Sequence, residues 1–268
     1  MLNSESETKA ESIDMKNYAS GFTAAALLCM CISGCQGPER TPATFKLLIL
    51  TGRNNHEWGK TTALLDSMLT GSGLFSVDVT TEPDTLTSED FKQYHALLSN
   101  WNSWPENDVR WPEAAEKGLL DFVGEGGGLI FFHAATSAFY AWPQFKQLST
   151  AAWILDSTRH GPVSMVEVRI RDREHPISRG LDDFFIRDEL WINAEQNESF
   201  RVLGVARDTE GDSGEQPAIM VGHYGKGRIF HTILGHDVMA VRNPGFQSML
   251  LRAAEWASSG RVSGSGQP

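Results

Sequence analysis

Histidines and carboxylates that could transfer protons follow several apolar segments of this 268-residue chain. His56 and His133 each come shortly after such a segment, as do the pairs Asp188-Glu189 and His236-Asp237. Histidine titrates near neutral pH, and a neighbouring carboxylate can orient it or act as the second acid/base group. These residue types predict acid/base chemistry. The candidate catalytic residues are His133, Glu189, His56, His236 and Asp237.

A second set of side chains could hold the substrate of such a site. Indole rings offer flat apolar faces on which a sugar ring can pack, and amide, carboxylate and imidazole groups offer hydrogen bonds. The candidate substrate-binding residues are Trp58, Trp101, Asn102, Trp191, Asp188 and His160. The alternative for the tryptophans is an ordinary place in the hydrophobic core.

Three of the histidines are also potential metal ligands. His56, His133 and His236, with one or two carboxylates, match the donor types that catalytic Zn²⁺ uses. No closely spaced pair such as H-x-x-x-H is present, so the ligands would have to come from separate loops. A divalent metal, zinc above all, therefore stays open as a cofactor beside metal-free acid/base chemistry.

Cysteine usage excludes several other kinds of site. The three cysteines are Cys29, Cys31 and Cys35, and the chain after them contains none. The remainder of the chain therefore has no disulfide, no zinc–thiolate site and no cysteine nucleophile.

The elements that must position these residues alternate between strands and helices. The almost continuous apolar run 45–50 is typical of a strand covered on both faces, and further strands are expected at 77–80, 95–99 and 129–132. Helices are expected at 59–69, 87–90 and 112–123. This alternation predicts an α/β fold with a doubly wound, mostly parallel sheet flanked by helices. Ligands bind such sheets beyond the carboxyl ends of the strands.

The second half of the chain adds strands without alternating helices. Strands are expected at 163–170, 184–191 and 201–206, followed by a hairpin of 218–224 and 228–234 around Gly225-Lys226-Gly227 and a helix at 244–257. We therefore expect one domain, residues 45–258, with additional strands in its C-terminal half. The Gly/Ser-rich residues 259–268 are predicted to be a disordered tail.

The N-terminal part resembles an export signal. An apolar stretch at 20–34, too short to span a bilayer comfortably, ends in Ile32-Ser33-Gly34-Cys35, which resembles a bacterial lipobox. We expect residues 1–35 to be a lipoprotein signal peptide starting at Met1 or Met15, Cys35 to be lipidated, and 36–44 to be a tether. The protein would then be exported and anchored by its N-terminal lipid at the periplasmic face or the outer membrane. The alternative is a chance apolar run.

The charge balance argues against one class of partner. The formal net charge is −11, and no run of lysine and arginine reverses it locally. Such a surface repels phosphate backbones, so nucleic acid is not an expected partner.

An ordered set of short motifs runs through about residues 45–258. The motifs are Thr51-Gly52 with His56, Gly126-Gly127-Gly128-Leu129 leading to His133-Ala134-Ala135, His175-Pro176-Ile177, Asp188-Glu189-Leu190-Trp191, and Tyr224–Phe230 leading to Leu234-Gly235-His236-Asp237. In this order they resemble the motifs of the ThuA (trehalose utilisation) family. The resemblance implies a class I glutamine amidotransferase-like, flavodoxin-like fold. Relatives of that fold carry a cysteine in the sharp turn after a strand, where this chain has Phe132-His133-Ala134-Ala135-Thr136. Amidotransferase chemistry therefore does not carry over.

The resemblance also implies a function. It points to a carbohydrate-processing protein that acts on a disaccharide-derived glycoside or 3-keto-sugar by isomerisation, elimination or hydrolysis, with a sugar oxidoreductase as an upstream partner and an oligomer possible. The alternative is a non-catalytic sugar-binding or assembly protein that uses the same crevice. A serine hydrolase built on Ser137 is disfavoured because the G-x-S-x-G pattern is absent there.

Overall fold

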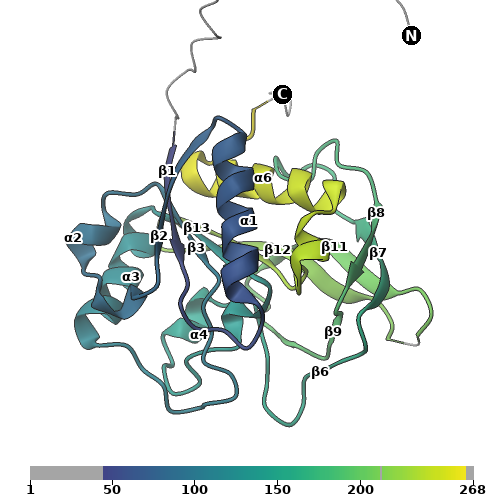
Figure 1. Cartoon of the computed structure of the whole chain (residues 1–268), viewed down its shortest axis with the longest axis horizontal. Helices are drawn as coiled ribbons and strands as arrows, with labels where there is room; N and C mark the ends of the chain where they lie inside the picture. The colour runs from purple at the N-terminus through teal and green to yellow at the C-terminus, as the bar shows by residue number, and fades with distance from the viewer. Residues whose placement is uncertain (1–44, 212, 264–268) are drawn as a thin grey trace, which may run out of the picture. The chain divides into compact units, whose positions relative to one another are not determined.

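The computed structural model describes residues 45–211 and 213–263 (Figure 1). The predicted signal peptide 1–35, the tether 36–44 and the lipidation site Cys35 lie outside the described residues. Among the helices that are described, none has the length and apolar character needed to cross a membrane.

Five parallel strands form one half of a nine-stranded sheet. In spatial order they are β2 (Phe75–Thr80), β1 (Phe45–Leu50), β3 (Ala96–Ser99), β4 (Gly128–Phe132) and β13 (Gly227–Thr232). The last four residues of β1 are buried, as expected of an apolar run covered on both faces. The strands predicted in the first half of the sequence are thereby confirmed.

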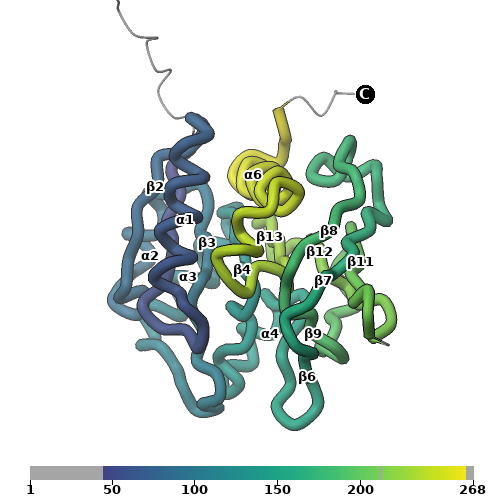
Figure 2. The backbone as a smooth tube through the Cα atoms, turned by 45° about the vertical axis from the view of Figure 1, so that its right-hand side comes forward, coloured from purple at the N-terminus to yellow at the C-terminus, as the bar shows by residue number. Residues whose placement is uncertain are grey.

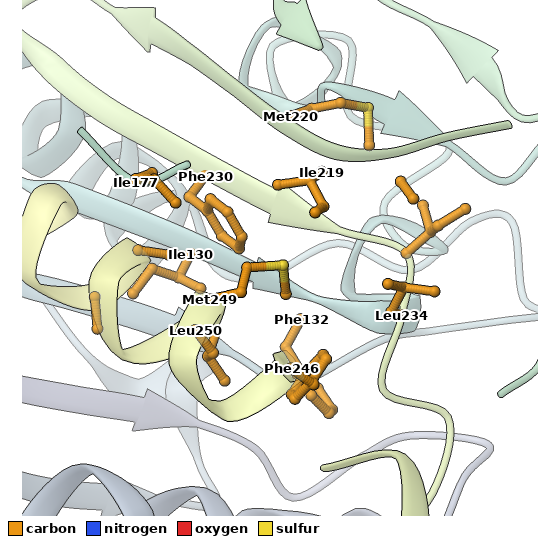
Figure 3. Packing of buried hydrophobic residues seen from close by; sticks show 14 of the residues in the cluster. Ile130, Phe132, Ile177, Ile219, Met220, Phe230, Leu234, Phe246, Met249 and Leu250 are labelled. Atoms are coloured by element: carbon orange, nitrogen blue, oxygen red, sulfur yellow. The ribbon is translucent and has the colours of Figure 1, made fainter. Parts of the chain in front are cut away.

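Helices cover both faces of these parallel strands. On one face, α1 (Trp58–Gly71) and α6 (Pro244–Ser259) share a core with Leu47 and Ile49 of β1. Figure 3 shows Phe246, Met249 and Leu250 of α6 packed close to the side chains of β4 and β13.

The other face of the parallel strands has its own core. There α2 (Ser88–Phe91) and α3 (Glu113–Glu125) pack on Leu48 and Leu50, which point the opposite way along β1. A Thr87 capping box begins α2. The shorter elements are the 3₁₀ turns η1 (Pro83–Thr85) and η2 (His133–Thr136), helices α4 (Phe145–Leu148) and α5 (Val238–Val241), and strands β5 (Ala151–Ala152) and β10 (Glu195–Gln196).

Four antiparallel strands extend the sheet beyond β13. They are β12 (Gln216–Tyr224), β11 (Arg201–Asp208), β7 (Ser164–Ile170) and β8 (Phe184–Asp188). The predicted hairpin is confirmed, with Gly225 at φ 57° in the turn between β12 and β13. The fold is therefore α/β with a large central sheet flanked by helices and added strands in the C-terminal half, as predicted.

The strand predicted at 184–191 is shorter in the structure. It ends at Asp188, because the carboxylate of this residue accepts a hydrogen bond from the next backbone N–H, that of Glu189, at 2.8 Å and turns the chain. After the turn, β9 (Trp191–Ile192) pairs with β6 (Arg159–His160) in a separate two-stranded sheet.

The folded body continues beyond the predicted boundary at 258. Helix α6 ends at Ser259, Val262 belongs to the core with 7% of its surface exposed, and the Ser263 backbone N–H donates to the Glu255 carboxylate at 2.8 Å. Residues 259–263 are therefore packed rather than part of a tail, since a valine can still bury its side chain after the helix ends.

Candidate functional site

Four strands that run in the same direction end at one edge of the sheet. The strands β1, β4 and β13 are parallel, and β8 regains their direction after the antiparallel steps through β12, β11 and β7. Figures 1 and 2 show β6 and β9 at this edge, the end from which α1 starts. The loops that leave these four strands carry His56, His133, Glu189 and His236. One ligand atom from each of the four lies within 4.8 Å of those from the other three.

His133 occupies the sharpest of these turns. It follows β4 directly and has φ 46°, a left-handed conformation that few residues other than glycine adopt. Its Nδ1 lies 2.6 Å from the Ile233 carbonyl oxygen, which can only accept, so Nδ1 carries the proton. Its Nε2 is buried and finds no hydrogen-bond partner within residues 45–211 and 213–263. Burial lowers the pKa of His133 well below its usual value, so this nitrogen presents a lone pair.

His56 is oriented by a neighbouring amide. The Asn54 Oδ1 accepts from the His56 backbone N–H at 3.0 Å, which fixes the amide orientation, and lies 2.9 Å from His56 Nδ1. Since this oxygen accepts, Nδ1 of His56 is the protonated nitrogen and Nε2 has the free lone pair. Burial and the neighbouring His236 lower the pKa of His56 to about 4, so the ring is neutral at pH 7.

Glu189 lies between two histidines. Its Oε2 is 2.9 Å from Nδ1 of His236, and its Oε1 is 3.2 Å from Nδ1 of His160. The Glu189 carboxylate raises the pKa of His236. Burial opposes ionisation of Glu189, but the contact with His236 outweighs it and lowers the pKa of the carboxyl. At neutral pH the carboxylate is therefore charged and faces imidazoles on both sides.

Asp188 supports this arrangement from below the surface. It has no exposed surface, and its carboxylate accepts from the backbone N–H groups of Glu189, Gly235 and His236 at 2.7–3.0 Å. Burial raises the pKa of Asp188 to about 7, against the effect of these three donors. Asp188 was predicted to bind substrate, but its oxygens are occupied by the backbone. It ties the Glu189 turn to the His236 loop.

Of the other predicted polar residues, one belongs to the site, one lies outside it and one supports it. His160 belongs to the site through Glu189. Asp237 does not join His236: it begins α5, where its carboxylate accepts from the Ala240 N–H at 2.9 Å. Asn102 donates to Asn54 Oδ1 at 2.9 Å, so it supports His56 through the amide that orients it.

His231 is a supporting residue that the sequence did not reveal. It is fully buried on β13, and its Nε2 lies 3.3 Å from the backbone carbonyl oxygen of His133. Since that oxygen accepts, His231 Nδ1 must accept in turn from the Thr150 hydroxyl at 2.6 Å. This contact supports the left-handed turn at His133. The register that pairs β13 with β4 creates it, and no local pattern in the sequence encodes that register.

A small cavity opens beside the cluster. Its volume is about 50 Å³. The lining residues are Asn55, His56, Trp104, Ala134, Ser137, Trp153, His160, Glu189 and Trp191. It can hold a few waters or one functional group, but not a whole sugar ring.

Only some of the predicted tryptophans reach this cavity. Trp191 lines the cavity but is only 2% exposed. Trp153 also lines the cavity and packs edge-on against Trp191, with the two ring centroids 5.2 Å apart. Trp104, which was not predicted, lines the cavity and is 37% exposed, so it offers a face to a ligand. Trp101 stacks on Phe139 within the core instead.

Trp58 begins α1 and is not among the cavity's lining residues. A larger surface hollow of about 770 Å³ lies elsewhere and includes no histidine of the cluster. Its buried carboxylate, Glu116, is already paired with Arg110. The small cavity therefore remains the candidate site.

Comparison with known proteins agrees with this architecture. The family described as trehalose utilisation, ThuA, matches residues 46–257. A ThuA-like protein from Parabacteroides merdae is 31% identical, with a TM-score of 0.73 over 83% of this chain and 92% of its own. No curated protein matches the chain.

More distant structures show the fold alone. A ThuA-like protein from Bacteroides uniformis is 20% identical, with a TM-score of 0.64 over 84% of this chain and 95% of its own. A β-galactosidase from Rahnella sp. R3 is 16% identical, with a TM-score of 0.56 over 80% of this chain and 31% of its own.

Proposed function

The chain belongs to the ThuA (trehalose utilisation) family, and on that premise we propose that its histidine–carboxylate pocket performs acid/base chemistry on a disaccharide-derived glycoside or 3-keto-sugar. The observation that carries the proposal is the ionised Glu189 carboxylate held at 2.9 and 3.2 Å between His236 and His160 beside a cavity. A base and a proton carrier in contact are what such chemistry needs.

The proposed reaction begins at the carbon next to the keto group. For a 3-keto-glycoside, the base removes the proton from C2, and the electron pair is delocalised onto the carbonyl oxygen. Return of a proton to the other carbon of the resulting enediolate completes an isomerisation. Expulsion of the glycosidic oxygen from C1, with a proton from an imidazolium, completes an elimination, and addition of water to its product completes a hydrolysis. The substrate enters already oxidised, so no redox partner acts within the site.

The cavity dimensions limit how the sugar would bind. About 50 Å³ admits the keto or hydroxyl group that reacts, while the rest of the sugar stays outside. The exposed face of Trp104 at the cavity is the proposed platform for that outer part.

The test is turnover of 3-keto-trehalose and of simple 3-keto-glucosides by the full chain, with exchange of the C2 hydrogen followed in D₂O. We expect Glu189→Gln to lower turnover by about 10²–10⁴-fold, the range for loss of a general acid/base group. The control His223→Ala alters an exposed histidine of β12 and should leave turnover unchanged. If no keto-sugar gave either turnover or hydrogen exchange, the enzyme proposal would be refuted.

The alternative function is non-catalytic sugar binding, and the aromatic lining favours it. In that case calorimetry would detect sugar binding, and no turnover would be observed. Trp104→Ala would then weaken binding about tenfold, equivalent to about 1.4 kcal/mol, while Glu189→Gln would change it little.

A further inference from the structure

We propose that His56, His133, His236 and Glu189 form a divalent-metal site, and that Zn²⁺ is the ion whose chemistry fits it best. The four residues come from four separate loops at one edge of the sheet, and their nearest ligand atoms all lie within 4.8 Å of one another. The site stands on this geometry, and only the catalytic role of the ion rests on the proposed function.

The three imidazoles are arranged around a common point. The His56 ring lies 4.7 Å from that of His133 and 4.8 Å from that of His236, and the His133 and His236 rings are 5.5 Å apart. The planes of each pair make angles of 75–88°. Rings that merely packed together would satisfy their nitrogens elsewhere. Here nitrogens from separate rings face the same small volume.

Proton positions prepare two of these rings for a cation. In His56 and His133, Nδ1 donates to Asn54 Oδ1 and to the Ile233 carbonyl, respectively. Both rings therefore present an unprotonated Nε2. A second hydrogen-bond partner that fixes the tautomer is the usual support of a metal-bound histidine.

An orphaned buried atom is the second, independent observation. His133 is 2% exposed, and its Nε2 has no hydrogen-bond partner among the residues that the structure describes. Leaving a buried acceptor of this kind unsatisfied is unfavourable. A cation would satisfy it. Packing does not explain why the protein accepts this unfavourable arrangement, because His133 also needs a left-handed backbone conformation to hold its side chain here.

The contact between His236 and Glu189 indicates the same centre. Nδ1 of His236 lies 2.9 Å from Glu189 Oε2, so both residues bring a potential ligand atom to the same place.

The ligand set selects the ion. Three imidazoles and one carboxylate, without thiolate, suit Zn²⁺ and related borderline ions better than Ca²⁺ or Mg²⁺, which prefer oxygen ligands. A tetrahedral zinc ion holds its donors about 3.4 Å apart, so the cluster would contract slightly on binding. With four protein ligands in place, the ion would polarise the carbonyl oxygen of a keto-sugar by expanding to five-coordination. Glu189 would then act as a ligand, and His160, outside the ligand set, would carry the proton.

The experiment measures zinc binding directly. The full chain carrying Cys29→Ser, Cys31→Ser and Cys35→Ser, which removes competing thiolates, is stripped with chelator and dialysed against Zn²⁺ alone. Bound metal is then counted by mass spectrometry, and Co²⁺ is used in parallel for its visible absorption. We expect one zinc per chain and the Co²⁺ bands of a nitrogen- and oxygen-ligated site.

Matched variants locate the ion. His56→Ala and His236→Ala, both at partly exposed positions, should weaken zinc binding by more than about 100-fold, while His160→Ala and His223→Ala should not. Circular dichroism confirms that each variant is folded. Less than half an equivalent of zinc in the parent chain, or unchanged binding in folded His56→Ala, would overturn the site. Zinc binding without keto-sugar turnover would leave the site intact and refute only the enzyme proposal.

Discussion

At the scale of single residues, the site is defined by which nitrogen of each histidine carries the proton. Asn54 and the Ile233 carbonyl fix this choice for His56 and His133, so that two lone pairs face the same volume. Asn54 is therefore as important to the proposed site as the histidine it orients. The role of this amide could not be predicted from the sequence, because it depends on an oxygen position that only the folded loop defines.

Removal of the Asn54 acceptor should loosen His56. We expect Asn54→Ala to weaken zinc binding by about 10–100-fold, the usual effect of losing a residue that orients a metal ligand. Asn54→Asp keeps an acceptor for His56 Nδ1 and should restore most of the affinity. His223→Ala, at an exposed position of β12 outside the site, is the control. Equal affinities for Asn54→Ala and the parent chain would show that His56 needs no such support.

At the scale of elements, the turn from β4 into η2 stores strain. His133 has φ 46°, a left-handed backbone conformation that costs an L-residue about 1–2 kcal/mol. The buried His231 of the neighbouring β13 supports this turn by donating to the His133 carbonyl oxygen. The strain is therefore located where the proposed site needs a side chain.

The strain can be separated from the chemistry by comparing two variants that both lack the imidazole. We expect His133→Gly to be more stable than His133→Ala by about 1 kcal/mol, because glycine adopts positive φ without the Cβ penalty. Urea denaturation of both variants measures the difference. If alanine were the more stable of the two, the turn would not be strained as the backbone indicates.

At the scale of the whole molecule, buried neutral histidines couple stability to pH. Burial lowers the pKa of His231 to about 4, and burial with the neighbouring His236 does the same for His56. The folded state thus binds fewer protons than the unfolded state, in which histidine titrates near 6.5. The destabilisation of the folded state that results is therefore absent well above pH 6.5 and grows as the pH falls from about 6.5 towards 4.

We therefore expect the free energy of unfolding to decrease as the pH is lowered from 7 to 4, because the lowered pKa values of His56, His133 and His231 outweigh the opposite effect of Asp188, whose pKa is raised. For the fully buried His231, the decrease approaches about 1.4 kcal/mol for each unit between the two pKa values. Denaturant titrations at several pH values measure the slope, and His231→Gln should flatten it. A slope that is the same in the variant would exclude His231 as a cause.

Export and lipid anchoring concern the part of the chain outside the described residues. The lipobox-like Ile32-Ser33-Gly34-Cys35 leads us to propose lipidation at Cys35. Expression in a bacterial host with labelled palmitate should label the parent chain and not Cys35→Ser. Equal labelling of both, or of neither, would contradict this proposal.

The strand–helix alternation, the hairpin at Gly225 and the family motifs could all be predicted from the sequence, because they depend on local periodicity and turn chemistry. His56, His133, Glu189 and His236 were also identified, since each follows a strand whose carboxyl end can form a ligand site.

Only the tertiary structure decided which of these candidates meet and in what role. It made Asp237 a helix cap and Asp188 a backbone support between the Glu189 and His236 loops, and it placed Trp101 in the core. It also brought Trp104, Asn54 and His231 into the site or its support. The physical reason is that direction and contact depend on sheet order and register. The antiparallel steps from β13 to β8 restore the strand direction that places Glu189 beside three histidines, and no local segment encodes that order.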